Sequence, residues 1–203
     1  GVGLSRRGLL TAPAVAVVVR QLVEQAARQF VAGTQPEDAV ALLGRLAAHG
    51  ATASFDILGE AVLSDQEAEQ YVRRYVALFE LLSQRPRAIQ GGQLNVSIKP
   101  SGLSPRCDPL DWDGSLTRLL GRLSPVVAEA RRLGASVTLD MEQYALRDLT
   151  LELARRLLNK HGRSNPPWLG IVIQAYLKDS EAIVDELVQM LSERDQNLSV
   201  RLV

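Results

Sequence analysis

Short apolar segments and amphipathic segments alternate along most of this chain. The apolar segments span residues 52–58, 94–99, 136–140, 169–176 and 198–203. Amphipathic segments lie between them, at about residues 64–82, 115–133, 146–160 and 180–194. Apolar runs of this length are typical of strands, and apolar residues that recur every three or four positions are typical of helices. The pattern therefore predicts five strands separated by four helices.

Local signals mark several of the predicted helices. A further helix is predicted over residues 35–50, with Pro36 in its first turn. Ser64 and Glu67 have the spacing of a capping box, in which the hydroxyl and the carboxylate each accept from a backbone N–H group. Pro125 lies inside the helix predicted at residues 115–133, which it should kink or split.

The alternation of strands and helices determines the expected fold class. Units of roughly 35–40 residues indicate βαβ connections and a parallel sheet. The two candidates are a (β/α)₈ TIM-like barrel and an open doubly wound sheet. A dinucleotide-binding doubly wound sheet should show Gly-x-Gly-x-x-Gly after a strand, and this motif is absent. We therefore expect an α/β barrel that is truncated after about the fifth strand, with two unpaired edges.

The beginning of the chain has a different pattern. Ser5–Leu10 and the apolar residues after it resemble a twin-arginine export signal. The apolar run continues into an amphipathic helix without a small-residue cleavage site, so we favour a surface helix. We expect residues 1–36 to form a helical arm and residues 37–203 to form the first part of the barrel.

Composition and charge narrow the function. The chain has 23 Lys and Arg residues and 23 Asp and Glu residues, and this balance argues against nucleic acid as a partner. Cys107 is the only cysteine, which excludes an internal disulfide and fits a reducing, cytoplasmic location. No apolar run reaches the roughly 20 residues that cross a bilayer. Metal-ligand spacing, a nucleophile elbow and a phosphate-binding loop are also absent from the sequence.

Polar residues gather at the carboxyl ends of the predicted strands. One or two follow or close each strand: Asp56 and Glu60, Lys99, Asp140 and Glu142, Gln174, and Arg201. Each has a structural explanation when taken alone, such as a turn, a solvated loop or an ion pair. In a parallel barrel, however, all strand carboxyl ends share the face that carries the active site. The set therefore predicts a site.

Three other residues are weaker candidates for chemistry. His49 and His161 lie at predicted helix ends, where we expect cationic rings that cap the helices and do not bind metal. Cys107 lies between Arg106 and Asp108, whose charges offset each other. We therefore do not expect Cys107 to be an activated nucleophile.

Five motifs resemble, in order and spacing, those of proline dehydrogenases. They are Ser54–Ala61, Val96–Lys99, Leu139–Gln143, Ile173–Tyr176 and Val200–Val203. Residues 140–150 look most like the bifunctional bacterial proline utilization A proteins, in which a second domain oxidises glutamate semialdehyde with NAD. The resemblance implies FAD as cofactor and L-proline as substrate, oxidised to 1-pyrroline-5-carboxylate by hydride transfer to the flavin. It further implies a membrane quinone as electron acceptor, with the protein cytoplasmic or peripheral at the inner face of the membrane. Whether the protein is a homo-oligomer stays open, and NAD is implied only if an aldehyde dehydrogenase domain follows.

The resemblance also implies roles for individual residues. Lys99 matches the lysine that holds the proline carboxylate, and Glu60 matches a carboxylate that orients a substrate-binding arginine. Asp140 and Arg201 match catalytic residues close to the reacting centre. The positions that match flavin contacts are Met141, Gln174, Arg201 and Val203.

The chain departs from the family pattern in two respects. Pro100 and Gly102 stand where leucine and alanine are usual, which leaves the conformation of that loop open. The sequence also stops before the later strands and the paired arginines of the family, so we expect this chain alone to be inactive. Two rival functions stay open: a non-catalytic scaffold, and a barrel enzyme that uses Lys99 as a Schiff-base nucleophile.

Overall fold

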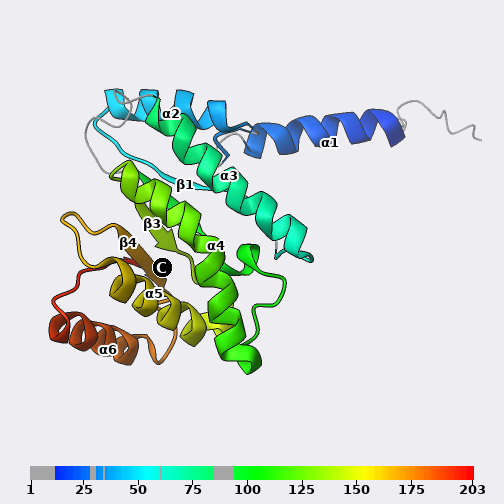
Figure 1. Cartoon of the computed structure of the whole chain (residues 1–203). Helices are drawn as coiled ribbons and strands as arrows, with labels where there is room; N and C mark the ends of the chain where they lie inside the picture. Colours follow the sequence, from blue (N-terminus) through cyan, green and yellow to red (C-terminus); the bar gives the residue numbers. More distant parts are fainter. Residues whose placement is uncertain (1–11, 28–30, 34, 60, 85–93) are drawn as a thin grey trace, which may run out of the picture.

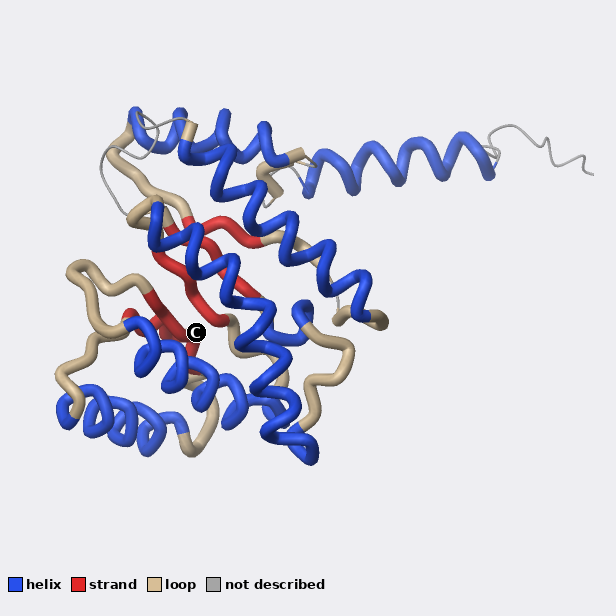
Figure 2. The backbone as a smooth tube through the Cα atoms, in the orientation of Figure 1, coloured by secondary structure: helices blue, strands red, loops and turns tan. Residues whose placement is uncertain are grey.

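A parallel sheet forms the centre of the computed structural model, which describes residues 12–27, 31–33, 35–59, 61–84 and 94–203. Helices α3 to α6 cover one face of this sheet (Figures 1 and 2). The strands are β1 (Ser54–Asp56), β2 (Asn95–Ile98), β3 (Ser136–Leu139), β4 (Leu169–Ile173) and β5 (Ser199–Leu202). The α-helices are α1 (Ala12–Ala27), α2 (Pro36–Ala48), α3 (Asp65–Ser83), α4 (Trp112–Arg132), α5 (Arg147–His161) and α6 (Ser180–Glu193). Short 3₁₀ turns are η2 (Pro100–Leu103), η3 (Pro109–Asp111) and η4 (Tyr144–Leu146).

The strand order distinguishes the two candidate folds. All four neighbouring pairs are parallel, and the order is β1-β2-β3-β4-β5. A doubly wound sheet reverses its order at a switch point, whereas a barrel adds each new strand beside the previous one. The sequential order therefore confirms the predicted open arc of (β/α)₈ type and excludes the doubly wound sheet.

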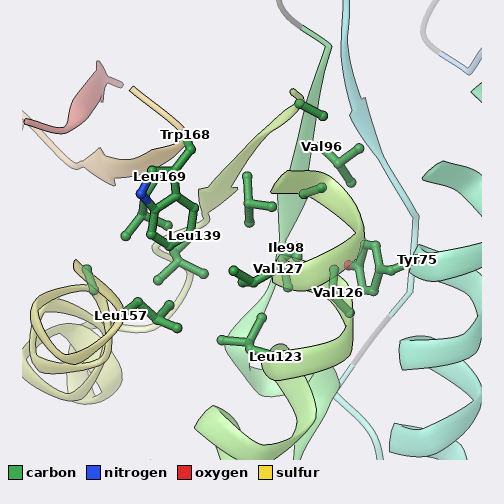
Figure 3. Close-up of a cluster of buried hydrophobic side chains, with 14 of the residues drawn as sticks. Tyr75, Val96, Ile98, Leu123, Val126, Val127, Leu139, Leu157, Trp168 and Leu169 are labelled. Carbon is green, nitrogen blue, oxygen red and sulfur yellow. The ribbon is translucent and has the colours of Figure 1, made fainter. Parts of the chain in front are cut away.

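The sheet face toward the helices is apolar. Val96, Ile98 and Leu139 are fully buried there, against the α4 residues Leu123, Val126 and Val127 (Figure 3). Leu157 of α5 and Trp168 extend the same core toward β4 (Figure 3). Because burial of hydrocarbon is the main stabilising term in folding, this face holds the arc together.

The opposite sheet face is polar at the same strands. Asn95 Nδ2 donates to Ser136 Oγ and to Thr138 Oγ1, each at 2.9 Å, and Ser54 Oγ donates to Asn95 Oδ1 at 2.5 Å. These side chains belong to three neighbouring strands in register. Successive strand residues point to opposite faces, so one strand supplies both the apolar core and this polar layer.

Some local predictions need correction. Pro125 was predicted to kink or split its helix, and α4 continues through it, so of these two outcomes the split does not occur. Buried residues on both sides of the proline, Leu123 and Val126 among them, hold the two halves on the sheet and offset the lost hydrogen bond. Ser64 caps α3 as predicted, but the Glu67 carboxylate accepts from the backbone of Leu63 instead of Ser64.

The terminal parts of the chain differ from the central strands. All residues of β4 are buried, as its apolar sequence predicts, whereas all residues of the edge strand β5 are exposed.

The predicted surface helix is α1, which projects from the sheet and exposes Val15, Val19 and Leu22 (Figure 1). Ser5–Leu10 lies outside the described residues. Among the described helices, none is long and apolar enough to cross a membrane.

Candidate functional site

Four charged side chains meet at the carboxyl ends of the strands. Lys99, directly after β2, donates from Nζ to Asp56 Oδ1 at 2.5 Å and to Asp140 Oδ2 at 3.5 Å. Arg201 of β5 donates from Nη2 to the other oxygen of Asp140, with which it also forms an ion pair. Asp140 therefore bridges the two cations. The structure brings Lys99, Asp140 and Arg201 together as the sequence predicted, with Asp56 as a fourth member.

The two central members of the charge cluster are shielded from solvent, and the two outer members are exposed. The side chains of Asp140 and Lys99 are 14% and 18% exposed, and those of Asp56 and Arg201 are 39% and 44% exposed. Asp140 is held in place because its backbone N–H donates to Ile98 O of the neighbouring strand at 2.9 Å. Charges interact more strongly where water is excluded, so these ion pairs are stronger than pairs on an open surface.

The environment of Lys99 keeps it charged. Burial alone would lower the pKa of its ammonium group, but the hydrogen bond and charge of Asp56, with the charge of Asp140, outweigh burial and raise the pKa. A Schiff-base nucleophile must lose its proton before it attacks. The raised pKa therefore argues against the rival function in which Lys99 is such a nucleophile.

For Asp140, the effect of burial on the pKa outweighs the effect of the neighbouring charges. Burial raises the pKa of its carboxyl group, and the positive charges of Arg201 and Lys99 oppose that rise. The carboxylate therefore takes up a proton at a higher pH than an exposed aspartate does. Protonation would weaken both of its ion pairs at once.

A polar layer that the sequence analysis missed lies beneath the charges. Ser97 Oγ accepts from Arg201 Nη1 at 3.3 Å and lies 3.4 Å from Ser54 Oγ. Ser97 is almost fully buried. The signal for this layer was the alternation of Asn95, Ser97 and Lys99, which places all three on one face of the strand.

Three of the four residues that match flavin contacts, Met141, Gln174 and Val203, lie just after the last residues of three neighbouring strands. Gln174 Nε2 donates to Met141 O at 3.2 Å, which joins the segments that follow β4 and β3. Val203 continues the pairing of β5 with β4, because its N–H donates to Ile173 O at 3.0 Å and its carbonyl accepts from Ala175 N at 2.9 Å. Met141 and Gln174 also line a small pocket beside α5 and α6.

The loop after Lys99 has a defined conformation despite its unusual sequence. Residues 100–103 form the turn η2, all of them buried, in which Gly102 N donates to Lys99 O at 3.0 Å. Proline suits the first position of such a turn because it has no N–H to satisfy. Glu60, the other predicted substrate-binding residue, lies outside the described residues.

The predictions for Cys107 and His49 agree with the structure, and the prediction for His161 does not. Burial raises the pKa of the Cys107 thiol to about 11, which agrees with the prediction that it is not an activated nucleophile. His49 lies at the end of α2 with its Nδ1 2.9 Å from Arg45 O, as a cap should. The prediction of a cationic cap is wrong for His161, because burial and the nearby charges of Lys160 and Arg131 lower its pKa.

Comparison with known proteins identifies the family. The family model for proline dehydrogenase matches residues 39–203. Bifunctional protein PutA of Escherichia coli is 29% identical over 92% of this chain and 14% of its own length. The proline dehydrogenase of Deinococcus radiodurans is 30% identical over 91% of this chain and 57% of its own length. This chain therefore spans between about a seventh and somewhat more than half of these curated relatives.

A solved structure agrees with the sequence comparisons. The crystal structure of PutA from Bdellovibrio bacteriovorus inactivated by N-propargylglycine has a TM-score of 0.87 and 34% identity, and the match covers 95% of this chain and 22% of that protein. The similarity includes all five strands, four of which carry the charge cluster in or directly after them, because the family model runs from α2 to the last residue. From the match over most of its length, this chain belongs to the proline dehydrogenase family.

Proposed function

We propose that this chain supplies one side of the active site of an FAD-dependent enzyme that oxidises L-proline to 1-pyrroline-5-carboxylate. The observation that carries the proposal is the charge cluster of Asp56, Lys99, Asp140 and Arg201 at the carboxyl ends of a parallel arc. Barrel enzymes build their sites on this face. Membership of the proline dehydrogenase family supports the choice of reaction, and the cluster supports the choice of residues.

Lys99 would bind the carboxylate of proline. An ammonium group has three N–H donors, and among the described residues Lys99 directs its donors to Asp56 and Asp140. The remaining donor is available to an oxygen of the substrate. The two carboxylates fix the position of Nζ, so little side-chain freedom is lost when the substrate binds.

The donor set fits a flavin ring. Arg201 offers a partly exposed guanidinium group, Gln174 offers an amide, and Val203 offers exposed apolar surface, while Met141 is buried next to Gln174. A flavin combines apolar faces with a polar edge that gains negative charge on reduction, so it needs this mixture of groups. When bound, FAD would supply the acceptor for the hydride that leaves the substrate carbon.

Asp140 and Arg201 would act close to the reacting centre. Arg201 would stabilise the negative charge that develops during reduction, because a fixed cation costs no reorganisation at that moment. Asp140 would orient both cations, since its two oxygens accept from Lys99 and Arg201. Glu60 would orient an arginine that binds substrate.

The proposal extends to the electron acceptor and the location. Electrons would pass to a membrane quinone, and the protein would work in the cytoplasm or at the inner face of the membrane. NAD would be used only by an aldehyde dehydrogenase domain, if one follows.

Anaerobic titration of the intact purified protein with L-proline tests the proposal. Flavin absorbance should bleach with proline, and it should return when a soluble quinone is added. A protein that contains no flavin, or a flavin that proline does not reduce, would contradict the assignment. Borohydride trapping with a carbonyl substrate tests the Schiff-base rival, for which a covalent adduct on Lys99 is required.

A further inference from the structure

A hydrogen bond joins the loops that follow β2 and β3. Ser101 Oγ donates to Glu142 Oε2 at 2.5 Å, between residues that lie 41 positions apart in the sequence. A bond of this kind, from a hydroxyl to a carboxylate, is stronger than a bond between neutral groups. The loops that it joins carry Lys99 on one side and Asp140 and Met141 on the other.

The Ser101 side of this bond is firmly anchored. All four residues of η2 are buried, and Arg122 Nη1 of α4 donates to Leu103 O at 2.8 Å. Arg122 also forms an ion pair with Asp65 at the start of α3. Two helices therefore fix η2 from outside the sheet.

The Glu142 side is more exposed. Residues 142–145 are exposed, and residues 140–143 have no regular secondary structure. Besides the Ser101 bond, three further bonds hold this part of the chain. Asp140 N donates to Ile98 O, Gln174 Nε2 donates to Met141 O, and Tyr144 Oη donates to Asp179 Oδ2. The exposed segment is therefore tied to each neighbouring strand by a side-chain bond, and Glu142 supplies the tie to the anchored turn.

We propose that Glu142 is a positioning residue that acts through Ser101. The ion pair with Lys99 and the backbone bond to Ile98 O already hold Asp140 near Lys99. Glu142 adds a second tie farther along the loop, which fixes Met141 relative to the turn that follows Lys99, so that the groups assigned to the flavin and to the substrate keep their relative placement. This consequence for catalysis rests on the proposed function, whereas the tie between the loops does not. Glu142 also contributes to the raised pKa of Lys99, so its charge and its hydrogen bond must be tested separately.

A double-mutant cycle in the intact protein separates these contributions. Glu142→Ala and Ser101→Ala should each speed amide exchange by roughly tenfold at Asp140 and Leu146, whose N–H groups donate to Ile98 O and Gln143 O. The double variant should be no faster than either single variant, because each change removes the same bond. Glu142→Gln keeps an acceptor for the hydroxyl and should show a smaller increase than Glu142→Ala. Gln143→Ala is the matched control in the same exposed segment and should leave exchange unchanged.

Proline kinetics form the second measurement in the same variants. We expect Ser101→Ala to lower kcat/KM by a similar factor to Glu142→Ala, although Ser101→Ala leaves the charge of Glu142 in place. The positioning role is wrong if Ser101→Ala changes neither amide exchange nor kcat/KM. It is also wrong if the effect of the double variant equals the sum of the effects of the two single variants. A protein without flavin would contradict the proposed function, while amide exchange would still decide whether the bond ties the loops.

Discussion

The same strands supply both faces of the sheet, and the two faces differ in the side chains that they carry. Toward the helices, Val96, Ile98 and Leu139 are fully buried among aliphatic side chains (Figure 3). On the other face, Asn95 and Ser97 alternate with two of these residues and bind only polar groups in the contacts described above. One face stabilises the arc by burying hydrocarbon, and the other keeps charges and hydroxyls in place.

The polar face differs from the usual interior of a barrel. Bulky branched residues normally fill the layers between the strands. Here Thr138 and Gly170 lie side by side, and a Cβ atom on Gly170 would lie 2.9 Å from Thr138 Oγ1. Small side chains leave the charged groups above them free to make hydrogen bonds instead of packing contacts. The comparison suggests that substitutions on the two faces will have separable effects on stability and on catalysis.

The largest expected effect is a loss of stability caused by a substitution on the apolar face. Leu139→Ala should lower the free energy of unfolding of the intact protein by about 2–5 kcal/mol, because it leaves a cavity among fully buried neighbours. Urea unfolding measures the change. Thr138→Ser, on the polar face at the adjacent position, should cost less than about 1.5 kcal/mol. Equal losses in the two variants would remove the distinction between the faces.

Lys99→Ala tests the polar face directly. The KM for proline should rise roughly ten- to a hundredfold, since loss of a charge-assisted contact costs about 1.5–3 kcal/mol. FAD content should stay close to that of the unchanged protein. Lys160→Ala, an exposed lysine at the far end of α5, is the control. A KM that is the same in Lys99→Ala and Lys160→Ala would exclude Lys99 from the substrate site.

Arg201→Ala should alter the cofactor more than the fold. Removal of a cation beside the reduced flavin should lower its two-electron midpoint potential by roughly 30–60 mV, which corresponds to about 1.4–2.8 kcal/mol. Potentiometric titration measures the shift. Arg163→Ala removes an exposed arginine that pairs with Asp195 and should have no effect on the potential. An unchanged potential in Arg201→Ala would mean that this residue is not beside the flavin.

The smallest expected effect concerns acid stability and lies away from the site. The pKa of His161 is lowered in the folded protein, so the unfolded chain binds a proton more readily. The stability that His161 contributes is therefore complete above pH 6.5 and is lost as the pH falls through the folded pKa. His161→Phe should reduce the fall in Tm between pH 7.5 and about pH 5.5, compared with His49→Phe. If both variants lose Tm in parallel with the unchanged protein, His161 does not contribute to this pH dependence.

Much of the fold was predictable because its signals are local. Period-two and period-3.6 patterns depend on neighbouring residues, so the five strands and their alternation with helices were predicted, with boundaries that differ by a few residues. Ser64 was recognised as a helix cap for the same reason. The carboxyl-end rule for parallel barrels then placed Lys99, Asp140 and Arg201 on one face.

The predictions that were wrong or incomplete depended on contacts between distant segments. Pro125 is an unfavourable helix residue by itself, but the buried residues on both sides of it decide that α4 continues. His161 lies at a helix end, yet its partly buried ring meets Trp168 edge-on at a centroid distance of 5.5 Å, and its Nε2 atom is buried. Burial and the charges of Lys160 and Arg131 lower its pKa, which disfavours the cationic form. In both cases the environment of the side chain is formed largely by residues that are distant in the sequence, so neighbouring residues do not predict it.

The sequence by itself determined the parallel α/β arrangement, the family and the residue types at the strand ends. Only the tertiary structure decided which of these groups are partners: Asp56 with Lys99, Asp140 between Lys99 and Arg201, and Glu142 with Ser101. Each of these pairs joins segments at least 41 residues apart. Their distances depend on strand register and loop packing, which arise only when the whole arc buries its apolar face.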